Sequence, residues 1–358
     1  MSTVEAPSRP RPAWSPSRLD QGERVRAVVI VVLLALILIG LPDLLSTYWL
    51  KILTAVSIYS IVCLGLGLLM GRVGLVSLGQ IAVLAIGSWV AARLLFGTGL
   101  PFPIVLLLSG FITMVIGTIV GLPALRVSGL YLALITLMLA GAISVVLAAT
   151  DFPNGAGGFL GHTESTLGGT SVRRPAIGES DPAFFRYSVV VAAAMFLLVL
   201  WHIRSKVGRS WEVIRQSEPA ALAAGINTTL YKLWAFALAS FITGVAGGVL
   251  AGAVHYLYSI TFPTQESITL LAVVLMGGAY SMWGAIVAAL LLQFLPALLN
   301  NWGVSADWLT ILFGIGVLQV LTTAPRGLAD QVPKDLSRLG RLLMGLRRRP
   351  AASGSDPA

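Results

Sequence analysis

Few residues of this sequence carry a charge, and only one is a cysteine. Charged residues make up 11% of the chain, whereas a soluble domain typically carries about a quarter. The single cysteine, Cys63, lies in an apolar run, so no disulfide framework exists and its side chain is expected to pack. These two shortages exclude an ordinary soluble domain and a disulfide-stabilised one.

Ionisable groups are also missing from the middle of the apolar runs. All 15 acidic residues lie in loops, in tails or at the ends of runs, whereas ion- and proton-coupled carriers generally keep a carboxylate or histidine at membrane depth. His162, His202 and His255 lie in a loop or near the ends of runs, and none has an obvious acidic partner. We therefore expect neither a metal site nor a proton-coupling site.

Motifs for nucleotide binding and catalysis are absent as well. The sequence contains no GxxxxGK(S/T) motif that would cradle a phosphate. It also brings together no nucleophile, base and orienting group. We expect no enzymatic activity and no cofactor bound by this chain. Energy for any uphill transport would have to come from a partner.

Long apolar runs are what the sequence has in abundance. Hydrophobic residues make up 56% of it and the mean hydropathy is +0.88. Apolar runs of about 18 residues or more can cross the hydrocarbon layer as helices, and the short alternating segments of a transmembrane barrel are absent. We predict an all-α polytopic membrane protein with about 8–10 transmembrane helices. The first begins at Ala27, and the others are expected near 50–71, 74–97, 101–122, 128–150, 184–202, 229–256 and 305–323.

The run from Ser267 to Leu299 is too long for one ordinary crossing, because roughly 33 residues would form a helix of about 50 Å. Gly277 and Gly278 interrupt it, which predicts two half-helices that meet inside the membrane. A weak internal repeat relates 276-MGGAYSMWG-284 to 70-MGRVGLVSLG-79 in the first half of the chain. Glycine-broken helices in two related halves point to a transport pathway, although close packing of helices at glycines explains the same spacing.

The net charge of +9 is concentrated in a few segments. Basic residues collect in the first 26 residues, in the 204–215 loop and after Arg326, as is typical of cytoplasmic segments. No aromatic residues alternate with the arginines of the tail, so nucleic acid is not an expected partner.

This charge distribution predicts the domain organisation. Both termini lie in the cytoplasm if the run from Ser267 to Leu299 is broken. The expected parts are a disordered basic cytoplasmic arm (1–26), a transmembrane domain (27–325) with an extracytoplasmic loop (151–183) and a cytoplasmic loop (203–228), and a basic cytoplasmic tail (326–358).

A short alanine-rich segment in the cytoplasmic loop carries its own helix signals. Glu218 and Pro219 favour a helix start, and Gly225 favours a left-handed helix end. A helix of about two turns is too short to be stable alone, so it must rest on another surface. The sequence leaves open whether that surface is another protein or its own transmembrane bundle.

The motif Glu218-Pro219-Ala220-Ala221-x3-Gly225 resembles the cytoplasmic E-A-A-x3-G loop of ABC importer permeases. Over roughly residues 50–330 the chain resembles the larger permease of branched-chain amino-acid ABC transporters of the high-affinity liv type. It departs from that pattern at Pro219, at Gln80, where histidine is also common, and at Ala324, where arginine is usual. The resemblance is carried, in order, by 71-GRVGLVSLGQIAVLAIGSWVAA-92, 125-LRVSGLYLALITLMLA-140, 154-NGAGG-158, residues 208–251, 275-LMGGAYSMWGAIVAALLL-292 and 325-PRGL-328.

The resemblance implies a non-catalytic permease subunit in a bacterial inner (plasma) membrane. Its implied partners are two ABC ATPase subunits that bind the ATP, a second, shorter permease and an extracytoplasmic solute-binding protein. A coupling helix near 216–226 would contact an ATPase through Glu218, Pro219, Ala220, Ala221 and Gly225, and we hypothesise that Arg209 and Arg215 fix it to an acidic partner surface. The alternative for these arginines is a solvated, positive-inside charge.

The translocation path is expected at the broken segments, although core packing is the alternative role for each residue. Branched-chain amino acids are the expected solute; urea, short amides or aromatic acids are alternatives in the same importer class. A cation-coupled carrier and a purely structural membrane subunit are further alternatives, and the missing buried carboxylate argues against the first. The predicted path residues are Ser77, Gly79, Gln80, Thr136, Gly277, Gly278 and Ser281.

Overall fold

The computed structural model describes residues 36–38, 40–124, 129–149, 170–171, 178–254, 256–257 and 262–303, with 308, 311, 314–316 and 329. It divides the chain into two units, residues 1–45 and 46–358. The first is represented by the short helix α2 (Leu41–Leu44). The predicted arm, the helix beginning at Ala27, most of the 151–183 loop and of the span near 305–323, and nearly all of the tail lie outside the described residues.

The second unit is built from helices, which confirms the all-α polytopic prediction. Five stretches in the described part of the chain are long and apolar enough to cross a membrane: Thr47–Val73, Phe102–Ile119, Asp181–Arg204, Thr228–Ala253 and Met282–Asn301. The helices are α3 (Thr47–Gly67), continued by the π-helix η1 (Leu68–Val73), α4 (Gln80–Thr98), α5 (Phe102–Ala124), α6 (Leu130–Ala149), α7 (Asp181–Arg204), α8 (Lys206–Gln216), α9 (Glu218–Ala223), α10 (Thr228–Ala253), α11 (Gln265–Gly277), α12 (Met282–Ala289), the π-helix η4 (Leu290–Phe294) and α13 (Leu295–Asn301).

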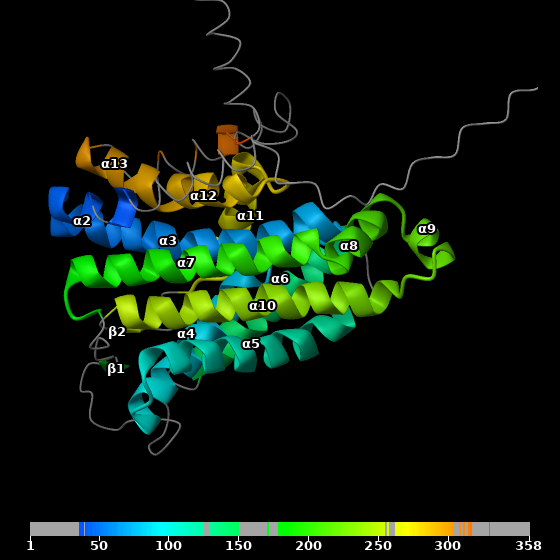
Figure 1. The fold of residues 1–358 in the computed structure, drawn as a ribbon, viewed down its shortest axis with the longest axis horizontal. Helices are drawn as coiled ribbons and strands as arrows, with labels where there is room; N and C mark the ends of the chain where they lie inside the picture. Colours follow the sequence, from blue (N-terminus) through cyan, green and yellow to red (C-terminus); the bar gives the residue numbers. More distant parts are fainter. Residues whose placement is uncertain are drawn as a thin grey trace, which may run out of the picture. The chain divides into compact units, whose positions relative to one another are not determined.

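A two-residue antiparallel pair, β1 (Thr170–Ser171) with β2 (Tyr256–Leu257), ties together the segments that precede α7 and follow α10. In Figure 1, β2 lies near the end of α10 that is farthest from α8 and α9. The α8–α9 connection therefore lies at one end of α10, and the β1–β2 pair lies at the other.

Helix α10 forms the core of the second unit. In its most apolar stretch 89% of the residues are buried. The helix packs mainly on α5, α4 and α3. Small residues allow this packing: a Cβ atom added at Gly87 of α4 would lie 2.7 Å from the Cα of Gly244 in α10. In lipid, where apolar side chains gain little by leaving the solvent, such close backbone contact is the usual source of helix association.

The two predicted helix breaks are confirmed. Helix η1 ends at Val73, Gly74 has a φ of +82°, and α4 begins only at Gln80. Helix α11 ends at Gly277, Gly278 has a φ of +109°, and α12 begins at Met282. The two breaks meet, because a Cβ atom at Gly71 would collide with the carbonyl oxygen of Ala279.

The 204–215 segment, which the charge pattern places in a predicted cytoplasmic loop, is mostly helical, because Lys206–Gln216 form helix α8. Ser205 caps the helix by accepting a hydrogen bond from the Val207 N–H at 3.1 Å. Trp211 and Ile214 are buried on one side of α8, and the Trp211 indole donates a hydrogen bond to the Tyr231 carbonyl oxygen at 2.8 Å. The high charge of this segment reflects the exposed side of an amphipathic helix.

Candidate functional site: a short capped helix and two glycine-broken segments

Helix α9 has well-defined ends that local sequence explains. Ser217 caps its start by accepting a hydrogen bond from the Ala220 N–H, and Pro219 occupies the first turn. At its end Gly225 has a φ of +77°. The Ile226 and Gly225 N–H groups donate to the carbonyl oxygens of Ala221 and Leu222, each at 2.9 Å. This pair of bonds is a Schellman motif, so the predicted stop at Gly225 is confirmed.

The residue that caps the start of α9 was not predicted from the sequence. Ser217 directly precedes the Glu-Pro pair, and serine in that place is an ordinary N-cap signal. Asn227 caps the next helix, α10: its Oδ1 accepts a hydrogen bond from the Leu230 N–H at 3.1 Å.

One side of α9 rests on its own chain. Ala221 is completely buried, and α9 packs on α8 and α10. Glu218 forms an ion pair with Lys232 of α10 at 2.7 Å, in which the lysine side chain is only 12% exposed. The other side of α9 presents Leu222, which is 58% exposed, beside the exposed Ala220, Ala223 and Ala224. The structure therefore supplies one support for the short helix and leaves an apolar surface uncovered.

We expect the ion pair to hold α9 in position against α10. Glu218→Lys or Lys232→Glu places like charges together. If α9 is the coupling helix that the resemblance implies, each variant should lower solute uptake per ATP about fivefold in reconstituted vesicles, which corresponds to about 1 kcal/mol. The exchange of both charges should restore much of the loss. A double variant that is as impaired as the single ones would contradict an intramolecular role for the pair.

The two arginines of the coupling hypothesis lie in different surroundings. Arg209 and Arg215 are both exposed on α8. Arg215 contacts its own chain: its Nη1 donates a hydrogen bond to the Gly71 carbonyl oxygen at 2.9 Å, and its guanidinium carbon lies 4.4 Å from the centre of the Tyr280 ring. Nothing in the sequence pattern indicated this contact, because Gly71 is 144 positions away.

Four of the predicted path residues lie together. Ser77, Gly79, Gln80 and Thr136 line a cavity of about 30 Å³ between α4, α5, α6 and α10. Thr136 Oγ1 accepts a hydrogen bond from the Leu78 N–H at 2.9 Å, and Gln80 Oε1 accepts one from Thr243 Oγ1 at 2.9 Å. The sequence missed Ser240, which also lines this cavity, and Thr243, because isolated hydroxyl residues in an apolar helix carry no distinctive pattern.

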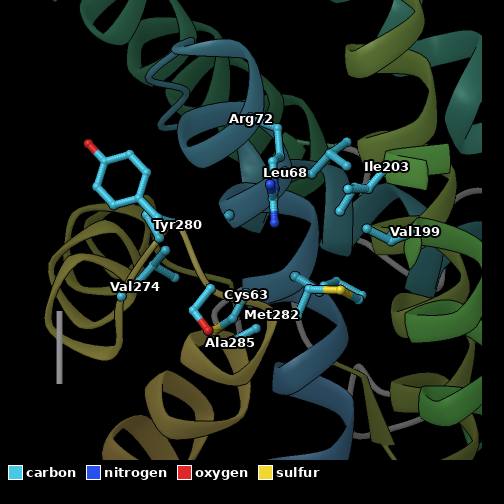
Figure 2. Close-up of a pocket in the computed structure, with 14 residues that line it drawn as sticks. Cys63, Leu68, Arg72, Val199, Ile203, Val274, Tyr280, Met282 and Ala285 are labelled. Atoms are coloured by element: carbon cyan, nitrogen blue, oxygen red, sulfur yellow. The ribbon is translucent and has the colours of Figure 1, made fainter. Parts of the chain in front are cut away.

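The other three predicted path residues lie elsewhere. Gly278 and Ser281 line a second cavity, of about 20 Å³, with Arg72, Tyr280 and Cys63. Figure 2 shows Tyr280 on one side of this cavity and Arg72 on the other. Gly277 serves packing, because a Cβ atom there would lie 2.8 Å from the backbone nitrogen of Ala288 in α12. Each cavity has room for about one or two water molecules, too little for an amino acid.

The remaining polar groups of the described segments offer no metal centre. No group of three or more His, Cys, Asp or Glu side chains in the described residues could hold a metal ion. Cys63 is fully buried, as expected for a packing residue. His202 lies in the last turn of α7, where its Nδ1 is 2.9 Å from the Leu198 carbonyl oxygen. His162 and His255 lie outside the described residues.

Known proteins that resemble this chain are transport permeases. Residues 48–321 match the family described as branched-chain amino acid transport system / permease component. The high-affinity branched-chain amino acid transport system permease protein LivM of Salmonella typhimurium is 29% identical over 333 residues, which is 88% of this chain and 78% of LivM. LivM of Escherichia coli matches to the same extent. The ribose import permease protein RbsC of Haemophilus influenzae is 25% identical over 81% of this chain and 89% of its own length. No solved structure matches.

Proposed function

Because the chain belongs to the family of branched-chain amino acid transport system permease components, we propose that it is one of two permease subunits of an ATP-driven importer of branched-chain amino acids. Its place is the inner membrane of a bacterium, with both termini in the cytoplasm. The importer also comprises two ATPase subunits, which bind the ATP, a shorter sister permease and an extracytoplasmic solute-binding protein.

The observation that carries this proposal is the construction of α9. The helix is capped at both ends, anchored to α10 through Glu218 and Lys232, and exposes Leu222 with its neighbouring alanines. A rigid helix with a small, apolar outer surface suits insertion into a cleft of another protein, since short side chains allow close approach. Such a helix in a cytoplasmic loop is what an ATPase subunit would need in order to push on the membrane helices.

Movement of α9 would be transmitted first to α10. Displacement of α9 acts on Lys232 in the second turn of α10, and α10 in turn packs on α4, α5 and α3. The cavity lined by Gln80 and Thr136 lies between α10, α4, α5 and α6. Movement of α10 therefore changes the space around the polar path residues, which fits a cycle in which ATP reverses the side to which the path opens.

The solute assignment rests on the relatives. The LivM proteins align with 88% of this chain at 29% identity, and the ribose permease aligns with less of it at 25%. The similarity to ribose permeases supports the importer class, whereas the match to LivM over 88% of the chain and the family match favour branched-chain amino acids over sugars. Calorimetric titration of the associated solute-binding protein with leucine, urea and ribose would test this choice, and binding of leucine alone is expected.

Cross-linking tests the docking of α9. Leu222→Cys in the full assembly is expected to cross-link to an ATPase subunit through a short thiol-reactive linker. Ala221→Cys, on the buried side of the same helix, should not. The native Cys63 is fully buried and so serves as an internal background. Absence of any ATPase cross-link from Leu222→Cys, or concentration of leucine by vesicles that contain this chain alone, would contradict the proposed function.

A further inference from the structure

In the described part of the chain, Arg215 contacts both glycine-broken segments. Its hydrogen bond reaches Gly71 in η1, and its guanidinium group lies over Tyr280 in the turn between α11 and α12. Arg215 itself lies in the last turn of α8, three residues before α9 begins at Glu218. The contact thus joins the base of the exposed helix to two elements that are distant in the sequence.

The Gly71 carbonyl group is well suited to receive this arginine. Helix η1 ends at Val73, and the last carbonyl groups of a helix have no partner within it. These groups also form the negative end of the helix dipole, which favours a cation. A charge-assisted hydrogen bond at 2.9 Å therefore satisfies an otherwise orphaned acceptor.

Glycines make room for the contact. A side chain at Gly71 would collide with Ala279 of the turn, and a Cβ atom at Gly74 would lie 3.4 Å from Cγ of Arg215. A side chain at Gly71 would push the turn away from η1, whereas the Cβ atom at Gly74 would lie in ordinary van der Waals contact with the arginine stem. The two breaks and the arginine are thus packed as one junction, and the cavity of Figure 2 adjoins it through Tyr280 and Arg72.

Helix α8 has the connections that a transmitting element requires. It packs on α9, from which only Ser217 separates it, and Trp211 fixes it to the start of α10 through the Tyr231 carbonyl oxygen. A displacement of α9 consequently moves α8, and Arg215 moves with it. The side chain can then pull on η1 and on the α11–α12 turn at the same time.

We propose that Arg215 is a positioning residue that transmits movement of α9 to both broken segments, rather than a surface charge for an ATPase. This inference rests on the proposed function, because it specifies how that movement spreads beyond α10. Arginine suits the role, since its planar guanidinium group donates in a fixed direction and also stacks on an aromatic ring, whereas lysine is a point charge on a flexible stem.

The test uses the complete transporter in vesicles, with leucine uptake and ATP hydrolysis measured in the same preparation. Arg215→Ala should lower uptake per ATP about tenfold, the factor expected for one lost charge-assisted hydrogen bond. ATP hydrolysis and the cross-link from Leu222→Cys should persist. Lys206→Ala removes a positive charge from the exposed start of the same helix and should leave both quantities unchanged.

Variants of Tyr280 provide a second measurement that leaves the arginine in place. Tyr280→Ala should lower uptake per ATP, and Tyr280→Phe, which retains the ring, should preserve it. A role confined to folding would instead lower the yield of assembled complex and leave uptake per ATP unchanged in the complexes that form. That result for both Arg215→Ala and Tyr280→Ala would overturn the inference.

Three further outcomes separate this inference from the proposed function. Loss of the Leu222→Cys cross-link in Arg215→Ala would show that the arginine serves ATPase docking, which also overturns the inference. Normal coupling in Arg215→Ala, together with uncoupling by Gly225→Val, would refute the role of Arg215 and leave the proposed function standing. Normal coupling in both variants would refute both.

Discussion

Under the proposed function, replacement of Gly225 by valine is expected to abolish ATP-driven leucine uptake, while the chain still inserts in the membrane and the partner ATPases still hydrolyse ATP. Gly225 has a φ of +77°, which costs a residue with a side chain on the order of 1–3 kcal/mol. A helix of only six residues cannot hold its last turn against that strain once the Schellman bonds weaken. Uptake in reconstituted vesicles should fall to the level seen without ATP.

The side chain at this position adds strain without adding a clash, because a Cβ atom at Gly225 would meet nothing within 4 Å. Gly225→Asn is therefore a matched control: asparagine tolerates the left-handed conformation and should retain most of the uptake. Equal uptake by the valine variant and the natural protein would show that the stop of α9 has no part in coupling.

Replacement of Gly247 by leucine should prevent the chain from folding. A Cβ atom at this position of α10 would lie 2.5 Å from the Leu84 carbonyl oxygen and 2.6 Å from the Ser88 nitrogen. Both are backbone atoms of α4, so no side-chain rotation can relieve the collision and the two helices must separate. The free energy of unfolding should decrease by about 3 kcal/mol, the upper end of the range for overpacked cores. The substitution lies in α10, the most buried of the five long apolar helices.

The yield of monodisperse protein in detergent, measured by size-exclusion chromatography of a fluorescent fusion, tests this expectation. Gly141→Leu is the control, because a Cβ atom at Gly141 of α6 would meet nothing within 4 Å, and its yield should match the natural protein. A monodisperse Gly247→Leu variant with normal thermal stability would contradict the close approach of α4 and α10.

Features that depend on neighbouring residues could be predicted from the sequence. The apolar runs near 101–122 and 184–202 correspond to α5 and α7, because a membrane forces each apolar run to satisfy its own backbone groups as a helix. The start and stop of α9 follow from Glu218, Pro219 and Gly225, and the break at Gly278 follows from its glycine pair. Each of these signals acts within a few residues.

Helix α8 shows what the local patterns did not reveal. The charges of this segment indicated a cytoplasmic connection between two spans, and the apolar positions Val207, Trp211 and Ile214 were too few to indicate a helix within it. What stabilises the helix is burial of Trp211 against α10, a contact with a residue 20 positions away. Sequence periodicity in a short amphipathic helix is weak evidence until the surface that it covers is known.

By itself, the sequence determined that the chain is a helical membrane protein with two glycine-broken helices and a short capped helix between its apolar runs, because hydrophobic length, capping and backbone freedom at glycine are local properties. Only the tertiary structure decided which residues meet. It separated the predicted path residues into two cavities, assigned Gly277 to helix packing, and placed Arg215 against Gly71 and Tyr280. These contacts join residues far apart in the chain, and they arise from how the helices pack on α10 and α3 rather than from any spacing within one segment.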